Sequence, residues 1–242
     1  MLPVYVLSLA GCEARRAPLL RSLRDLGFEP EVVLGIDGRN GLAPEHESRI
    51  DRAMAKRRTG RWLTDGEFAC ALSHQTLCAR LLAEGHEQAM ILEDDAIVDR
   101  DLLPVLADLA EIDFDLLLLD HDRTRVLRRS MRRLSSGSVL WRVVNIPDMN
   151  TGYILNATGA AAIIERSFPI SYMADWPCDI SALRTYAIMP RAVGRPASKE
   201  ASLLQAERLR SKQSVRREYK ALPYSNRDLT SRINRLTSRR LL

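Results

Sequence analysis

The sequence has 242 residues, of which 46% are hydrophobic and 28% charged, a composition typical of globular proteins rather than disordered or fibrous ones. No stretch approaches the roughly 20 consecutive apolar residues that a membrane-spanning helix requires. The net charge of +5 is uneven, because the chain from Arg208 onward holds eleven Lys or Arg and two acids, which leaves about −4 on the first 207 residues. We therefore expect an acidic globular domain over residues 1–205 and a basic extension over 206–242.

The start of the chain predicts a strand followed by a helix. Residues 2–9 form an apolar strand, and residues 13–26 carry apolar side chains at helical spacing, with Gly27 as a stop signal. The stretch Leu9-Ala10-Gly11-Cys12 is similar to a lipoprotein cleavage box, but no Lys or Arg precedes it, as a signal peptide requires. A second strand over 31–34 places Asp37 just beyond its carboxyl end, where open α/β sheets bind ligands.

A capping box opens the next predicted helix. Thr64 and Glu67 have the spacing at which the threonine side chain accepts a hydrogen bond from the Glu67 amide and the glutamate side chain accepts one from the Thr64 amide. His74 follows seven residues later, about two turns on and on the same side of the helix. Taken alone, Glu67 is explained by the cap, and a single helical histidine is most often a satisfied core residue.

Three consecutive acids end the most apolar strand of the chain. Residues 90–92 form a short buried strand, and Glu93, Asp94 and Asp95 follow it directly. Because three adjacent carboxylates repel one another, a divalent cation is expected to offset their charge. Hard oxygen ligands suit Mg²⁺ or Mn²⁺, which commonly bridge protein carboxylates to substrate phosphates. The alternative is a solvated turn whose acids favour the positive N-terminus of the following helix.

The remaining pattern alternates strands and helices. A helix is expected over 101–111 and a buried strand over 115–119, ending at Asp120. Residues 121–138 contain six arginines without a strong pattern and predict a long, mobile loop. Further elements are expected as strands 139–144 and 151–155 and a helix over 158–166. This order indicates an α/β fold with a doubly wound, mostly parallel sheet.

The cysteines indicate the compartment. Cys12, Cys70, Cys78 and Cys178 lack the paired spacing of a metal site. Two of them, Cys70 and Cys78, fall eight residues apart in one predicted helix, about 12 Å, which is too far for a disulfide. Free thiols in a reducing cytoplasm are the simplest explanation, so we expect a cytoplasmic protein.

Two segments together resemble glycosyltransferase family 25, which includes bacterial lipooligosaccharide glycosyltransferases and relatives among collagen galactosyltransferases. They are GEFACALSH, residues 66–74, and ILEDDAIV, residues 91–98. Weaker matches are VYVLSL with Arg15 and Arg16, GIDGR, Asn150-Thr151-Gly152-Tyr153 and Gly159-Ala160. The resemblance covers most of residues 2–205.

This resemblance implies a GT-A type fold over residues 1–205, a nucleotide-sugar donor, usually UDP-linked, and transfer with inversion. The acidic triplet then stands in for the family's DxD motif, with Asp95 binding Mn²⁺ or Mg²⁺ directly and Glu93 assisting through the ribose or a water. The other positions assigned to donor binding are Ser8, Asp37, Glu67, His74 and Asp94. The sequence departs from the family pattern at Ser8, where asparagine is commoner, and at Asp120-His121, which replaces a glycine-containing turn.

An inverting transfer also needs a carboxylate base that is not tied to the metal. We expect this base in the turn 175–179, with Asp175 first and Asp179 second. Trp176 offers a flat face that could stack on a sugar ring. The alternative is that Asp175 caps a helix, in which case Asp120 and Asp148 are the next candidates.

The sequence thus predicts a cytoplasmic, metal-dependent, inverting enzyme that moves a hexose, with galactose favoured, from a UDP-sugar to a lipooligosaccharide or other cell-surface glycan. A metal-dependent phosphoesterase or nuclease is the first alternative. Nucleic-acid binding through the arginine clusters ranks third, because the body is acidic and few aromatic residues accompany the arginines. We expect the basic extension to be helical and to contact an anionic membrane surface. The alternative is that it packs on its own body or on a second subunit.

Overall fold

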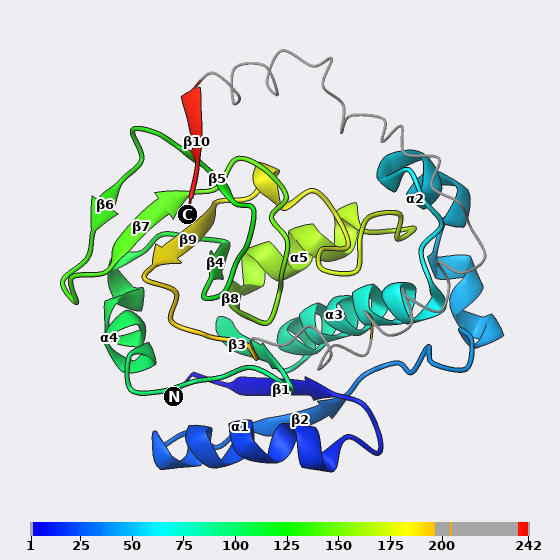
Figure 1. The fold of residues 1–242 in the computed structure, drawn as a ribbon, viewed down its shortest axis with the longest axis horizontal. Coiled ribbons are helices and arrows are strands. Elements are labelled where there is room, and N and C mark those ends of the chain that lie inside the picture. Colours follow the sequence, from blue (N-terminus) through cyan, green and yellow to red (C-terminus); the bar gives the residue numbers. More distant parts are fainter. Residues whose placement is uncertain (1, 197–203, 205–236, 242) are drawn as a thin grey trace.

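The computed structural model describes residues 2–196, 204 and 237–241, which form a mixed α/β fold around an eight-stranded sheet (Figure 1). Across the sheet, the strands are β2 (Glu31–Leu34), β1 (Val4–Ser8), β3 (Gln88–Glu93), β8 (Gly152–Asn156), β4 (Leu116–Leu118), β9 (Thr185–Met189), β7 (Val139–Arg142) and β6 (Arg132–Arg133). All of these strands except β8 and β7 run in the same direction. The predicted α/β class and mostly parallel sheet are confirmed.

Helices cover both faces of the sheet (Figure 1). The helices are α1 (Glu13–Asp25), α2 (Arg52–Thr59), α3 (Asp65–Ala83), α4 (Leu102–Ala107) and α5 (Ala157–Arg166), with 3-10 turns η1 (Pro44–Arg49), η2 (Asp108–Glu111) and η3 (Ile180–Ala182). Alternate residues of β1 point to opposite faces, so Tyr5 joins the core formed with α3 and α5, whereas Val6 joins the core formed with α1 and α4. This two-sided burial explains why the central strands are continuously apolar.

Local sequence signals fix where the helices beside β3 and β8 begin. Thr64 and Glu67 form the predicted capping box at the start of α3, and the side chain of Asn156 accepts a bond from the Gly159 amide at the start of α5. Gly159 is required for packing, because a Cβ atom there would overlap the carbonyl oxygen of Asp115. Helix α5 therefore lies directly against the chain that leads into β4.

The prediction of a mobile loop over 121–138 is wrong. This segment contains β6 and a further strand, β5 (Arg125–Leu127). Val126 is fully buried, and Leu134 is also part of the core. These isolated apolar side chains anchor the segment, while its arginines lie around them.

The prediction of a helix at the C-terminal end is wrong for the last described residues. Residues 238–240 form β10 (Ser238–Arg240), which pairs antiparallel with β5. The Arg239 guanidinium lies 4.1 Å from the centre of the Trp141 ring, and Leu241 packs against the core on the α3 side. The last described residues thus pack on the body of the protein, which was the alternative to membrane contact given for the extension. Residues 205–236 and 242, which held the rest of the predicted extension, lie outside the described residues.

Within the described residues, no helix is both long and apolar enough to cross a membrane.

Candidate functional site

The predicted acids meet at one edge of the sheet, where β1, β3 and β4 end. Leu7 of β1 is in register with Glu93 at the end of β3. The amide of Glu93 donates to the Thr151 carbonyl at 2.9 Å, and the amide of Asp120 donates to the Gly152 carbonyl at 3.1 Å. The start of the antiparallel strand β8 therefore lies between the ends of β3 and β4. This is the carboxyl-end position at which open α/β sheets bind ligands.

An arginine from α1 holds two of the three consecutive acids. Arg15 contacts Asp94 through Nε to Oδ1 at 2.6 Å and Asp95 through Nη2 to Oδ2 at 2.5 Å. The Ser8 hydroxyl donates to Asp94 Oδ2 at 2.8 Å. Three of the predicted donor residues are thus brought together. Arg15 was not predicted as a site residue, although its position at the start of the helix that follows the first strand was a signal, because this helix begins at the same edge.

The surroundings of Asp95 favour a cation. Burial, followed by the nearby charge of Glu93, raises the pKa of Asp95 to about 6, and Arg15 only partly opposes this shift. Burial likewise raises the pKa of Asp94. Among the described residues, buried Asp95 Oδ1 has no hydrogen-bond partner. A desolvated carboxylate oxygen in this state is suited to a hard divalent cation, so the residues fit the Mg²⁺ or Mn²⁺ site predicted from the sequence.

Glu93 is the member of the triplet that meets α3. Its Oε1 lies 3.6 Å from His74 Nε2, and His74 Nδ1 lies 2.9 Å from the Tyr153 hydroxyl. One ligand atom from each of Cys70, His74 and Glu93 falls within 4.8 Å of the other two. The two sequence segments that carried the resemblance therefore contact each other directly in the fold.

Glu67 and Asp37 are both engaged by arginines. Glu67 is fully buried, and its two oxygens contact Arg61 at 2.5 and 2.7 Å while one also accepts from the Thr64 amide at 2.9 Å. The Arg39 guanidinium donates to both oxygens of Asp37, with Nε 2.9 Å from Oδ1 and Nη2 2.5 Å from Oδ2, and it lowers the pKa of Asp37. Arg39 also donates to the carbonyl of Ala10, which ties Asp37 to the turn after β1. Donor binding by Glu67 and Asp37 stays a prediction.

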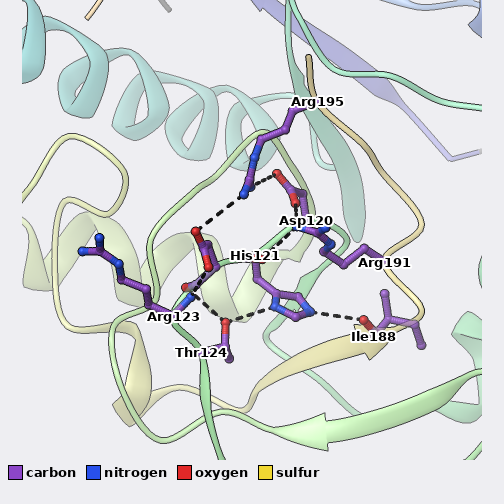
Figure 2. A network of polar contacts seen from close by, with 8 residues as sticks. Asp120, His121, Arg123, Thr124, Ile188, Arg191 and Arg195 are labelled. Carbon is purple, nitrogen blue, oxygen red and sulfur yellow. Dashed lines mark hydrogen bonds and ion pairs between the residues drawn. The ribbon is translucent and has the colours of Figure 1, made fainter. Parts of the chain in front are cut away.

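The segment after β9 crosses the same edge and brings two arginines to Asp120 (Figure 2). The amide of Gly194 donates to the carbonyl of Ile97, on the chain just beyond the acidic triplet. The fully buried carboxylate of Asp120 contacts Arg191 Nη1 at 3.3 Å and Arg195 Nη1 at 2.9 Å. Arg195 also reaches Asp122, with Nη2 3.6 Å from Oδ2. Sequence reasoning missed these arginines, because they lie about seventy residues from Asp120 along the chain.

His121 follows Asp120 in this network. Its Nε2 lies 3.2 Å from the carbonyl oxygen of Ile188, and its Nδ1 lies 3.1 Å from the Thr124 hydroxyl. Burial lowers the pKa of His121. The lowered pKa favours the neutral imidazole, which lies between the strand and the loop, below Arg195 in Figure 2.

The turn over 175–179 differs from expectation. Trp176 is only 2% exposed and packs against Tyr153 with ring centres 5.3 Å apart, so it is not free to stack on a sugar. Asp179 accepts a bond from the Ser181 amide at 2.9 Å and caps η3. Asp179 and Asp175 do not share a helix face, because this helical turn begins only after Asp179. Asp175 is half-buried in the irregular segment before it.

Asn150 is a further residue that sequence reasoning did not select. It is 2% exposed and directly precedes Thr151, between the ends of β3 and β4. Its Nδ2 has no hydrogen-bond partner in the described part of the chain. Met149, before it, adopts a left-handed backbone with φ of 77°. A buried amide donor without a described partner thus lies on the segment that enters the candidate site, and the only sequence signal for it was its place in the Asn-Thr-Gly-Tyr match.

Comparison with known proteins gives one family match and several curated relatives. Residues 1–179 match the sequence model described as glycosyltransferase family 25 (LPS biosynthesis protein). The chain is 35% identical over 96 residues to the probable inactive glycosyltransferase 25 family member 3 of Rattus norvegicus, covering 38% of this chain and 17% of that protein. It is 24% identical over 181 residues to procollagen galactosyltransferase 1 of Danio rerio, covering 70% of this chain and 29% of that protein. The chain thus spans less than a third of the length of these curated relatives.

Proposed function

Because the chain belongs to glycosyltransferase family 25, we propose that it transfers a hexose from a UDP-sugar to a lipooligosaccharide or another cell-surface glycan, with inversion. Galactose is favoured because three of the matched relatives are named procollagen galactosyltransferases. The acceptor class follows the family description as an LPS biosynthesis protein. The relatives named inactive make a direct test of turnover necessary.

One observation carries this proposal: among the described residues, the buried Oδ1 of Asp95 has no hydrogen-bond partner. Asp95 lies beside Glu93 and Arg15. Asp95 and Glu93 would hold Mn²⁺ or Mg²⁺, which supplies charge stabilisation for the departing diphosphate. Arg15 adds a second positive charge at the same position. Ser8 orients Asp94 through its hydrogen bond and so fixes the pair of acids that Arg15 holds.

Asp175 is our proposed base for the attacking hydroxyl. Its neighbour Trp176 packs on Tyr153, which in turn contacts His74 beside Glu93, so this segment lies on the α3 side of the donor edge. Asp120 is a weaker candidate, because two arginines hold its carboxylate. The base must accept the proton of the acceptor hydroxyl as the bond to the anomeric carbon forms.

The test is UDP release from a panel of UDP-sugars with and without Mn²⁺, using the wild type, Asp95→Asn and Asp101→Asn. Asp101 is an exposed acid in the turn after the triplet whose side chain makes no capping bond, so it is a matched control. We expect Asp95→Asn to lower Mn²⁺-dependent turnover by roughly 100-fold or more, while Asp101→Asn behaves as wild type. Equal activity of the wild type and Asp95→Asn would refute the role of Asp95.

A second variant separates chemistry from binding. Asp175→Asn should lower the turnover number by roughly 100-fold without weakening UDP binding measured by calorimetry. Failure of every UDP-sugar to bind or turn over would refute the proposed donor class.

A further inference from the structure

We propose that Cys70, His74 and Glu93 form a binding site for a soft divalent ion of the Zn²⁺ class, which shares Glu93 with the oxygen site at Asp95 and adds a sulfur and a nitrogen ligand from α3. Cys70 and His74 are four residues apart on α3, so their side chains lie on one helix face. Glu93 approaches that face from the end of β3. The three ligand atoms, a sulfur, an imidazole nitrogen and a carboxylate oxygen, all fall within 4.8 Å of one another.

The distance between His74 and Glu93 fits two ligands of one ion better than a hydrogen bond. Their Nε2 and Oε1 atoms are 3.6 Å apart, which exceeds the usual hydrogen-bond range. Two ligands placed about 2.0–2.2 Å from a tetrahedral zinc ion lie about 3.4 Å apart. The observed spacing therefore leaves room for an ion between the two atoms.

His74 presents an unsatisfied nitrogen to this space. Its side chain is 3% exposed, and within the described ranges its Nε2 has no hydrogen-bond partner. A buried polar atom without a partner is costly and requires an explanation. A metal ion coordinated by Nε2 supplies one.

The other ring nitrogen of His74, Nδ1, has a hydrogen-bond partner, as the second nitrogen of metal-binding histidines commonly has. His74 Nδ1 lies 2.9 Å from the Tyr153 hydroxyl, and the Tyr153 ring is fixed against Trp176. When Nδ1 carries the proton and donates to Tyr153, Nε2 keeps its lone pair as a metal ligand, 3.6 Å from Glu93 Oε1. Such outer contacts fix both the tautomer and the ring orientation of a ligand.

The donor set selects the type of ion. A thiolate and an imidazole favour Zn²⁺, whereas Mg²⁺ and Mn²⁺ favour the oxygens near Asp95. Cys70 is part-exposed and the Glu93 side chain is 26% exposed, so an ion can enter from solvent. Three protein ligands leave a fourth position for water. The thiol proton is released to solvent as the sulfur binds.

The experiment uses the full chain after chelator treatment, titrated with Zn²⁺ by calorimetry and with Co²⁺ by absorbance, with no sugar donor present. We expect one Zn²⁺ per chain and a thiolate-to-cobalt charge-transfer band. Cys70→Ser should abolish the band and weaken Zn²⁺ binding by more than about 100-fold, whereas Tyr153→Phe should weaken it by about 10- to 100-fold. Cys12→Ser, which removes another part-exposed thiol, is the matched control and should bind as wild type.

Asp95→Asn distinguishes this site from the neighbouring oxygen site, because it should retain the cobalt band while losing Mn²⁺ binding measured by calorimetry. No stoichiometric Zn²⁺ in the wild type, or a Cys70→Ser protein that binds Zn²⁺ as tightly as wild type, would overturn the proposal. Circular dichroism checks that each variant is folded. Should Cys70→Ser not fold, an unchanged Zn²⁺ affinity in Tyr153→Phe would overturn it instead. Because no readout depends on sugar transfer, failure of the metal site and failure of the proposed activity are distinguishable.

Discussion

Removing Arg195 should destabilise the protein more than neutralising its partner Asp120. The Asp120 carboxylate is fully buried, whereas the side chains of Arg195 and Arg191 are 28% and 47% exposed (Figure 2). In Arg195→Ala the buried carboxylate keeps only the longer contact to Arg191, at 3.3 Å. In Asp120→Asn both guanidinium groups remain partly hydrated. The loss of stability is therefore expected to be larger when the buried carboxylate is left without Arg195 than when the arginines are left without Asp120.

The magnitudes follow from burial. Breaking a buried ion pair costs about 3–5 kcal/mol when a buried charge is left unpaired. Because Arg191 still neutralises part of that charge, we expect Arg195→Ala to lower the free energy of unfolding by about 3 kcal/mol. Asp120→Asn keeps the side-chain size and loses charge-assisted hydrogen bonds to groups that water can reach, for about 1–2 kcal/mol. The double variant should cost less than the sum by about 1–2 kcal/mol, because the two residues contact each other.

Equilibrium unfolding in urea measures these free energies for the wild type, both single variants and the double variant. Arg100→Ala, in the exposed turn that precedes α4, controls for loss of a surface arginine and should change little. A larger loss for Asp120→Asn than for Arg195→Ala would refute the reasoning. So would strictly additive values, since they would mean that the contact of 2.9 Å carries no coupling.

Two further outcomes are expected. Burial lowers the pKa of His121 below its usual value near 6.5, so the folded state resists protonation and the contribution of His121 to the free energy of unfolding falls as pH drops through 6.5. The raised pKa of Asp95 acts in the opposite direction, so the test is a comparison of variants: His121→Gln should lose less stability than wild type between pH 7 and pH 5, and an equal loss would contradict this. The chain from Arg208 carries a net charge of +9, and each basic residue near an anionic leaflet contributes about 1 kcal/mol to membrane binding. The full chain should therefore co-sediment with anionic vesicles. Equal sedimentation of a chain ending at Arg208 would rule out membrane contact by the extension.

Much of the fold could be predicted because local patterns and burial agree. The apolar run that ends at Glu93 is β3, and the capping box of Thr64 and Glu67 begins α3. These elements are defined by neighbours within a few residues. The strand β5 could not be predicted in this way, because it pairs with β10, more than a hundred residues later. Short strands rich in arginine carry no periodicity of their own, and their stability comes from contacts made across the fold.

The candidate site could be predicted only at the level of which strand ends meet. The carboxyl ends of β3 and β4 placed the acidic triplet and Asp120 at one edge, as their order in the chain implied. The partners of these acids depend on tertiary packing, so Arg15, Arg195 and Asn150 were missed. Exposure is likewise a tertiary property, which is why the sequence suggested an accessible Trp176 and the fold buries it.

The acidic triplet shows how far spacing alone can assign roles. Three adjacent carboxylates are chemically alike in the sequence, yet each has a different environment in the fold. Asp94 is held by both Ser8 and Arg15, Asp95 keeps one buried oxygen that no other described group satisfies, and Glu93 faces His74 at 3.6 Å. An incoming cation gains least at Asp94, whose two oxygens are already engaged by Arg15 and Ser8, and most where carboxylate oxygens are still unpaired. We therefore propose that the arginine does not replace the metal predicted from the sequence: Asp95 and Glu93 would hold the ion, while Asp94 stays bound to Arg15 and Ser8.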